Sequence, residues 1–180
     1  MRKALFFLAG IMIMLTYSCG NQGWKKNQKT SENSITQADD GTISLTLENA
    51  AFYSNAKNPS GNTAEWSVVV SQPGRYGVWL ASATKDTVDL SYTNSVKVTM
   101  LDTHLEVIPE ADKIIQNSGD VTYPFYRADS YMGSFFISEP GVYNIQVISE
   151  KVIQREAKNE PRYQADNTRL MSVILKPNTR

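Results

Sequence analysis

A chain of 180 residues is long enough for one folded domain with appended segments. Its 18 basic and 18 acidic residues balance, and nucleic-acid binding is not expected, because it calls for a clustered basic face. The single cysteine excludes an internal disulfide bond, and the single histidine argues against a histidine-rich metal site.

The first 18 residues have the pattern of a signal peptide. Arg2 and Lys3 form a charged start, and the next 12 residues, 4–15, are apolar. Such a run is too short to span a bilayer as a helix, which takes roughly 20 residues. Ser18 and Cys19 then resemble the cleavage site of bacterial lipoproteins, in the looser form found in Bacteroidetes. The resemblance implies that residues 1–18 are removed and that acylated Cys19 anchors the protein in the outer membrane.

The segment after Cys19 is polar and rich in Asn, Gln, Ser and Lys. It has too few apolar residues to offset the entropy of ordering, so residues 19–40 are predicted to be the lipidated cysteine and a flexible linker. Residues 41–180 are predicted to form one domain. The leader leaves open whether this domain faces the periplasm or the outside.

From residue 41 onward, apolar residues recur with a period of two, which is typical of β-strands. Strands are expected at 43–47, 66–70, 76–80, 88–92, 96–100, 105–108, 135–137, 143–147 and 170–175. A helical turn is expected at 111–117, and a long loop or irregular strand at 150–167. Short strands separated by turn residues predict an all-β, two-sheet sandwich.

Two segments of the sequence resemble each other, 71–80 (SQPGRYGVWL) and 138–147 (SEPGVYNIQV). In each, a Pro-Gly pair suits a type II turn, and a strand that opens with tyrosine follows. The pattern predicts two hairpins, which favour a jelly roll.

The run Trp66-Ser-Val-Val-Val70 followed by Pro73-Gly-Arg-Tyr-Gly-Val-Trp-Leu80 resembles galactose-binding-like jelly rolls. These include carbohydrate-binding modules of families 6 and 35 and trailing domains of some α-L-fucosidases. The segments 132–143 and 170–177 are also similar, and the resemblance covers about residues 41–178. It implies a jelly roll and a non-catalytic role in glycan recognition, although its motifs are mostly packing residues.

The resemblance also implies a structural Ca²⁺ ion, which family members often hold between a glutamate on the first strand and an acidic residue on the last. Glu48 stands at the first of these positions. The last strand, 170–175, offers no carboxylate, although Ca²⁺ takes six to eight oxygen ligands. Glu48 is therefore the one metal ligand that the sequence suggests.

Sugars bind by stacking their apolar faces on aromatic rings while polar side chains contact the hydroxyls. Trp79 alternates with Tyr76 and Val78, so it is predicted to face away from the core, whereas Trp66 is predicted to lie within it. Other aromatic and polar residues stand in predicted loops, where the alternative for each ring is packing. The candidate ligand-binding residues are Trp79, Tyr126, Tyr53, Arg127, Tyr131, Asn58, Tyr163 and Asn167.

The sequence thus predicts a lipid-anchored, non-catalytic protein of the bacterial cell envelope that binds an oligosaccharide or polysaccharide, with affinity insensitive to salt. The alternative is a protein-interaction module that uses the same aromatic surface against an envelope partner. A hydrolase is not expected. Asp102, Glu106, Glu110 and Asp112 read as a solvated acidic loop, and no nucleophile-elbow, metalloprotease or phosphate-loop motif occurs.

Overall fold

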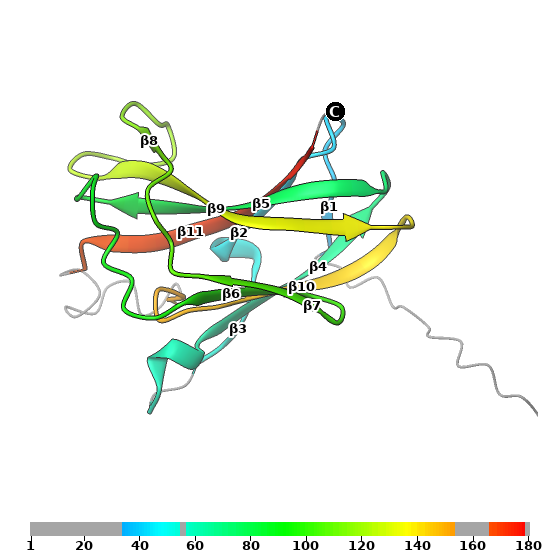
Figure 1. Ribbon diagram of the computed structural model, residues 1–180, viewed down its shortest axis with the longest axis horizontal. Coiled ribbons are helices and arrows are strands. Elements are labelled where there is room, and N and C mark those ends of the chain that lie inside the picture. Colours follow the sequence, from blue (N-terminus) through cyan, green and yellow to red (C-terminus); the bar gives the residue numbers. More distant parts are fainter. Residues whose placement is uncertain (1–33, 55–56, 154–165, 179–180) are drawn as a thin grey trace, which may run out of the picture.

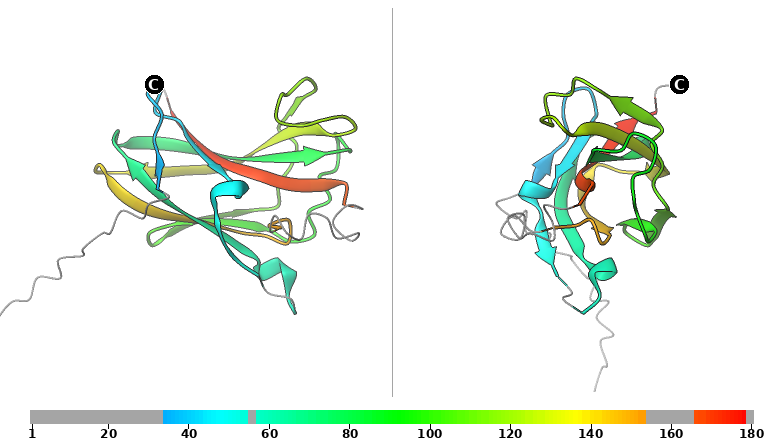
Figure 2. Two further views of the ribbon diagram at one scale, coloured as in Figure 1. Left: turned by 180° about the vertical axis from the view of Figure 1, so that it is seen from behind. Right: turned by 90° about the vertical axis from the view of Figure 1, so that its left-hand side faces the viewer.

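The computed structural model describes residues 34–54, 57–153 and 166–178, which fold into two β-sheets packed face to face (Figure 1). Figure 2 shows the two layers from behind and from the side. The predicted signal peptide, Cys19 and Tyr163 lie outside the described residues. The prediction of an all-β, two-sheet jelly-roll sandwich is confirmed. Within the described ranges, no helix is long and apolar enough to cross a bilayer.

The first sheet, sheet A, has the strand order β1-β4-β10-β6-β7, and β3 also pairs with β4. Its strands are β1 (Ile35–Thr36), β3 (Ala51–Tyr53), β4 (Thr63–Val70), β6 (Val96–Met100), β7 (Thr103–Val107) and β10 (Gly141–Ile148). Sheet B has the order β2-β11-β5-β9-β8. Its strands are β2 (Ile43–Thr46), β5 (Gly74–Thr84), β8 (Lys113–Ile115), β9 (Tyr126–Ile137) and β11 (Thr168–Pro177). Two short 3₁₀ helices, η1 (Leu47–Asn49) and η2 (Pro59–Gly61), flank β3.

The core lies between the sheets and is made by alternate residues of their strands. Along β4, every second residue from Ala64 to Val70 is buried, and Trp66 is a core residue as predicted. Its indole Nε1 donates a hydrogen bond to the Thr46 carbonyl at 2.8 Å, which satisfies the ring's one polar atom. Gly133 of β9 has φ +125°, and a Cβ there would stand 3.0 Å from Leu105 of β7. The glycine therefore admits Leu105 between the sheets.

The two similar sequence segments form connections between the sheets, and not the hairpins that the sequence predicted. β4 of sheet A leads through 71–73 into β5 of sheet B, and β9 of sheet B leads through 138–140 into β10 of sheet A. Gly141 pairs with Val70, and Gly74 pairs with Ile137, so both connections lie at the same end of the sandwich. The expected type II geometry is also absent at Gly141, whose φ is not positive.

A tyrosine closes each of these connections in the same way. The Tyr76 hydroxyl donates to the Gln72 carbonyl, and the Tyr143 hydroxyl donates to the Glu139 carbonyl at 2.6 Å. In both cases the acceptor stands four residues before the tyrosine. The repeated motif is therefore a device that fixes the chain as it crosses between sheets, similar to the tyrosine corner of other β-sandwiches.

The fold begins before residue 41, within the segment assigned to the linker. Ile35 and Thr36 pair in parallel with Val68 and Val69 of β4. Gln37 is 7% exposed. Its amide nitrogen donates to Gly41 O and Tyr76 Oη, and its amide oxygen accepts from the backbone nitrogens of residues 71 and 72. Residues 35–37 are thus part of the sandwich.

Two local predictions were wrong. Residues 88–92 form no strand, because carboxylates bond the backbone there: Asp86 accepts from the amides of Val88 and Asp89, and Asp89 accepts from the amide of Ser91. The hydrogen bonds from the backbone N–H groups of Val88 and Asp89 lower the pKa of the Asp86 carboxyl. The helical turn expected at 111–117 is instead the edge strand β8, which pairs with β9.

Candidate functional site

The outer face of sheet B, which points away from sheet A, carries an exposed group of aromatic rings. Trp79 of β5 stands opposite Tyr131 of β9. Phe136, an exposed residue of β9, stands opposite Arg75, which precedes Trp79 by four residues in β5. The rise of a strand places these two levels about 13 Å apart. We call Trp79, Tyr131 and Phe136 the aromatic strip. The alternation that predicted an outward Trp79 is confirmed, and the ring is half-buried and not covered over.

The rings of Trp79 and Tyr131 contact each other with centroids 5.0 Å apart. The ammonium group of Lys176, from β11, lies 5.6 Å from the Trp79 ring centroid. Lys176 is an exposed side chain, and an exposed cation–π contact contributes only about 0.5–1 kcal/mol. A ligand that displaces the ammonium group from the indole therefore loses little.

A cavity of about 840 Å³ opens on the same face, toward the other end of the sheet. Strands β2, β5, β9 and β11 line it with Ser44, Ala83, Arg127 and Ser172, among others. Residues 120–125, in the loop between β8 and β9, form one wall. Ile174 also lines the cavity and pairs with Trp79 in the sheet, so the cavity extends toward the aromatic strip. Its volume lies in the range typical of small-ligand sites.

Arg127 is held rigidly at the cavity wall by two carboxylates. Its Nε donates to Asp129 Oδ1 at 2.7 Å, and its Nη1 is ion-paired with Asp120 of the wall loop. Burial lowers the pKa of Arg127, but the hydrogen bonds and charges of Asp129 and Asp120 outweigh this and raise it overall. Because its charge is matched twice, Arg127 shapes the cavity and joins the loop to β9.

Phe125 lies in the loop wall between two further cations. The guanidinium carbon of Arg169 lies 4.9 Å from the ring centroid, and the Lys85 ammonium lies 5.1 Å from it. Lys85 is held at this end of the sheet because its backbone N–H donates to Asn167 O at 2.9 Å. This places the backbone of Asn167, a candidate from the sequence, next to Lys85, but Asn167 does not line the cavity.

A smaller cavity of about 590 Å³ lies on the other side of the same loop. Tyr126 lines this second cavity together with the loop residues 116–119. Val121, Thr122, Tyr123 and Phe125 line both cavities. The Tyr123 ring is 84% exposed, so the loop presents an aromatic edge to solvent between the two hollows.

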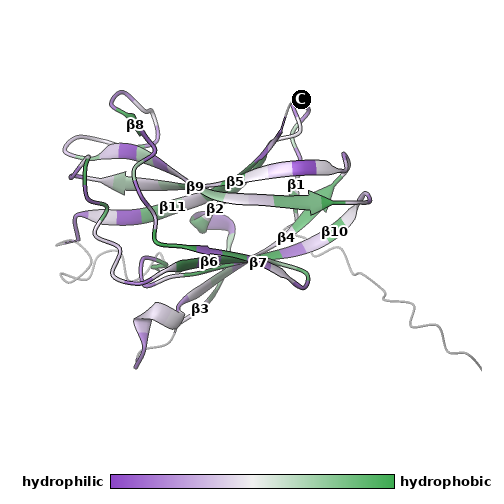
Figure 3. Ribbon diagram, in the orientation of Figure 1, coloured by the Kyte–Doolittle hydropathy of each residue, from purple (hydrophilic) through white to green (hydrophobic). Residues whose placement is uncertain are grey.

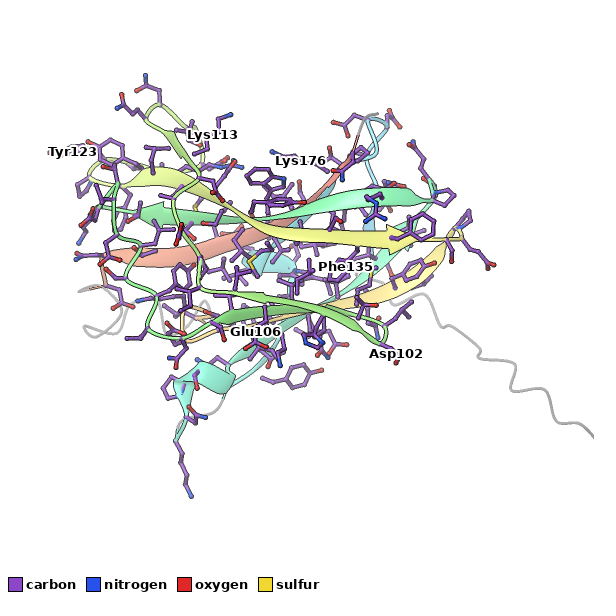
Figure 4. The ribbon with its side chains drawn as sticks, in the orientation of Figure 1. Asp102, Glu106, Lys113, Tyr123, Phe135 and Lys176 are labelled. Atoms are coloured by element: carbon purple, nitrogen blue, oxygen red, sulfur yellow. The ribbon has the colours of Figure 1, made fainter. Side chains whose placement is uncertain are left out.

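Figure 4 labels Tyr123, Lys113 and Lys176 on the side of sheet B and Asp102 and Glu106 on the side of sheet A, with Phe135 between the sheets. Figure 3 shows hydrophilic segments in purple within β5, β9 and β11, the central strands of sheet B.

The structure does not bring all predicted residues together. Tyr53 is on β3, and Asn58 stands at the start of η2, so both belong to the sheet A side of the sandwich. The two packed sheets and the core between them separate both residues from Trp79. Tyr163 lies outside the described residues. The candidates that share the outer face of sheet B are Trp79, Tyr131 and Arg127, with Tyr126 and Asn167 at its end.

Glu48, the suggested metal ligand, lines the main cavity from η1. Met171 and Ser172 of the last strand line the same cavity, so the two positions that the resemblance implied do meet. In the described ranges, no group of three or more His, Cys, Asp and Glu side chains could hold a metal ion. A calcium ion bound by Glu48 stays a prediction.

The acidic residues considered for catalysis are dispersed. The Glu106 carboxylate accepts from Ser95 Oγ at 2.6 Å and pairs with Lys97 at 3.1 Å, and these contacts lower the pKa of Glu106. Asp112 instead accepts a hydrogen bond at 2.6 Å from the backbone N–H of Tyr131, in the other sheet. The contacts of both carboxylates are structural.

Phe125 and Arg169 are cavity residues that the sequence analysis did not select. Arg169 was omitted because the sequence predicted the last strand only from residue 170, whereas β11 begins at Thr168; β11 also contains a β-bulge between Leu170 and Ser172. The spacing of Leu170 and Val173, two core residues an odd number of positions apart, is the sequence signal of that bulge.

Comparisons with known proteins show the fold. No family model and no curated protein matches the chain. Among solved structures, an α-L-fucosidase from Vibrio sp. strain EJY3 is similar with a TM-score of 0.63 and 19% identity over 81% of this chain. The chain spans 24% of the fucosidase, about a quarter of its length.

Two further structures match at lower scores. One is the GH26-CBM35 β-(1,4)-mannanase of Podospora anserina, with a TM-score of 0.46 and 11% identity over 78% of this chain and 28% of its own. The other is the Cry4Aa toxin of Bacillus thuringiensis, with a TM-score of 0.49 and 9% identity over 82% of this chain and 25% of its own. At such identities the likeness concerns the sandwich architecture alone.

Proposed function

We propose that the chain is a lipid-anchored, non-catalytic carbohydrate-binding protein of the bacterial cell envelope, and that it binds glycans on the outer face of sheet B. The observation that carries the proposal is the aromatic strip beside the cavity, with Tyr131 45% exposed and Phe136 65% exposed. Several exposed aromatic rings on one solvent-facing surface are unusual in a protein, and they offer flat apolar surfaces for sugar rings.

The chemistry of the face fits a polyol better than an apolar ligand. The hydroxyl groups of Ser44, Thr46 and Thr122 stand in the cavity wall. These groups can donate to and accept from sugar hydroxyls. The likeness of the fold to part of an α-L-fucosidase is in keeping with this proposal.

Isothermal titration of the mature chain against a panel of plant, host and bacterial oligosaccharides tests the proposal. Trp79→Ala is expected to reduce the affinity at least tenfold, because the indole offers the largest stacking surface on the face. Tyr53→Ala, which removes an exposed ring from the sheet A side, is the matched control and is expected to leave the affinity unchanged. An absence of binding to every glycan in the panel would refute the proposal. Stoichiometric capture of an envelope protein without added sugar would support the interaction module instead.

The lipid anchor has a separate test. Cys19→Ala is expected to prevent acylation and to move the protein from the membrane fraction to the soluble fraction of the producing cells. Metabolic labelling with a fatty-acid analogue reports the acylation directly. Labelling that persists in the Cys19→Ala variant would exclude this residue as the anchor.

A further inference from the structure

The main cavity contains a guanidinium group that forms no ion pair with the residues that the structure describes. Arg169 lines the cavity, and its Nε is buried without a hydrogen-bond acceptor. It takes part in none of the ion pairs among the described residues. A buried N–H of a charged group that lacks an acceptor is costly, and the part of Arg169 that stays exposed in the cavity can contact an anionic partner.

Arg127 and Arg169 differ in their charge partners. Both arginines line the same cavity, but Arg127 has two carboxylate partners, whereas Arg169 rests on the Phe125 ring. Glu48 is the one carboxylate in the cavity lining besides Asp120, and no ion pair joins it to Arg169. Arg169 is therefore the cation of the cavity that is available to a ligand.

Three lysines also lie on this face of the sandwich, although Lys176 is near the opposite end of β11 from Arg169. Lys85 lies beyond the Phe125 ring, Lys176 lies over Trp79, and Lys113 projects from β8. None of the three has an ion-pair partner among the residues that the structure describes. Figure 4 shows Lys113 and Lys176 on the same side of the sandwich. Carboxylates also lie on this face, Glu48 and Asp120 in the cavity and Asp112 beside Tyr131, but the cations Arg169, Lys85, Lys113 and Lys176 have no ion-pair partner among the described residues.

On these grounds, and resting on the proposed function, we propose that the bound glycan is acidic. A carboxylate or sulfate group of the sugar accepts hydrogen bonds from Arg169 in the cavity. The rest of the glycan extends along β5 and β11 toward Trp79. The guanidinium group suits this role because its donors match the oxygens of a planar carboxylate or a sulfate in pairs. Ile174, which joins the cavity to the aromatic strip, marks the path.

The test compares three probes of equal length by isothermal titration: oligogalacturonate, sulfated galacto-oligosaccharide and neutral galacto-oligosaccharide. The wild type is expected to prefer at least one acidic probe to the neutral one by about tenfold or more, the scale of a hydrogen bond to a charged group. The preference should shrink as the salt concentration rises toward about 1 M, where charges are screened within about 3 Å. The two acidic arms distinguish a carboxylate from a sulfate as the group recognised.

Arg169→Gln is expected to abolish the preference for the acidic probe, and Arg169→Lys to restore part of it, because lysine keeps the charge but not the paired donors. Lys97→Gln is the matched control. It removes one positive charge from sheet A, where Lys97 pairs with Glu106, and should leave the preference intact. If Arg169→Gln does not fold, Arg169→Lys and the salt dependence of the wild type provide the test.

The outcomes separate this inference from the proposed function. Equal affinity for the neutral and acidic probes, or a preference that survives in Arg169→Gln, overturns the inference and leaves glycan binding standing. Loss of binding to all probes in Trp79→Ala, with the acidic preference lost in Arg169→Gln, supports both. Binding of none of the three probes by the wild type overturns the inference, and the wider oligosaccharide panel then decides the proposed function.

Discussion

Trp79 and Tyr131 stand directly opposite each other on β5 and β9, with their ring planes inclined at 52°. The register of the two strands shifts by one residue at this point, between Val78 and Trp79. The β-bulge brings Tyr131 level with the indole, and Asp112 fixes the bulged strand by accepting from the Tyr131 N–H. Asp112 thus holds the backbone of Tyr131, and the Tyr131 ring packs against the Trp79 ring and supports its position.

Such a pair should show energetic coupling. In a double-mutant cycle of Trp79→Ala and Tyr131→Ala, the free energies of unfolding are expected to be non-additive by about 0.5–1.5 kcal/mol, the usual contribution of an aromatic pair. Urea unfolding measures each term. The cycle of Trp79→Ala with Phe136→Ala is the control and should be additive, because the two rings stand about 13 Å apart along the sheet. Additivity in both cycles would contradict the bracing role of Tyr131.

Phe135 and Phe136 are neighbours in the chain with opposite roles. Phe135 is 1% exposed in the core, and Phe136 is 65% exposed on the outer face. Phe135→Ala is expected to lower the free energy of unfolding by about 3–5 kcal/mol, because it leaves a cavity between the sheets. Phe136→Ala should change it by about 0.5 kcal/mol or less and should instead weaken glycan binding. Thermal melts and titrations on both variants check this, and an exchange of the two phenotypes would contradict the orientation of β9.

The strands were predictable because their signal is local. A period of two in the run from Trp66 to Val70, or from Tyr76 to Leu80, follows from one side of each strand being buried. The outward orientation of Trp79 followed from the same rule. The failure at 88–92 is also local in origin, since Asp86 and Asp89 bond to backbone amides that a strand would need.

Sheet membership could not be predicted in this way, because pairing joins residues that are distant in the sequence. The Pro-Gly motifs predicted hairpins, yet each connects strands of different sheets. Tyr53 and Asn58 were grouped with Trp79 as loop residues near a ligand, but the pairing of β3 with β4 puts them on the other sheet. Arg169 was missed because the predicted strand began at residue 170, whereas pairing with the distant strand β5 extends β11 back to Thr168.

Gln37 connects the beginning of the fold to the first crossing between sheets. Gln37→Ala leaves the N–H groups of residues 71 and 72 without their acceptor and removes a donor to Tyr76 Oη. We expect the free energy of unfolding to fall by about 1–3 kcal/mol, the cost of buried polar groups without partners. Asn49→Ala, which removes an exposed amide bonded to Thr46, is the matched control and should change it by about 0.5 kcal/mol or less. Equal effects of the two variants in urea unfolding would show that residues 35–37 contribute nothing to the sandwich.

Tyr92 makes stability depend on alkaline pH. Burial raises the pKa of Tyr92 above its ordinary value; the hydrogen bond that joins its hydroxyl to Ser82 Oγ at 2.9 Å lowers it, and the charge of Glu150 raises it. Below a pH of about 10 the phenol is protonated in both the folded and the unfolded chain, and its contribution to stability is fully present. Above that pH the unfolded chain releases the proton and the folded chain keeps it. The free energy of unfolding therefore falls as the pH rises, by at most about 1.4 kcal/mol per pH unit for this one group.

Tyr92→Phe removes this pH dependence together with the hydrogen bond. Near neutral pH the variant is expected to be about 1 kcal/mol less stable than the wild type, the usual contribution of a hydrogen bond. The difference should shrink between about pH 9 and pH 11, since the wild type alone loses the contribution of the buried phenol. Ser82→Ala is the control, because it removes the hydrogen bond but keeps the phenol buried, and it should retain the fall in stability. Urea unfolding at several pH values measures all three chains, and a constant difference between wild type and Tyr92→Phe across this range would show that Tyr92 ionises equally in the folded and unfolded states.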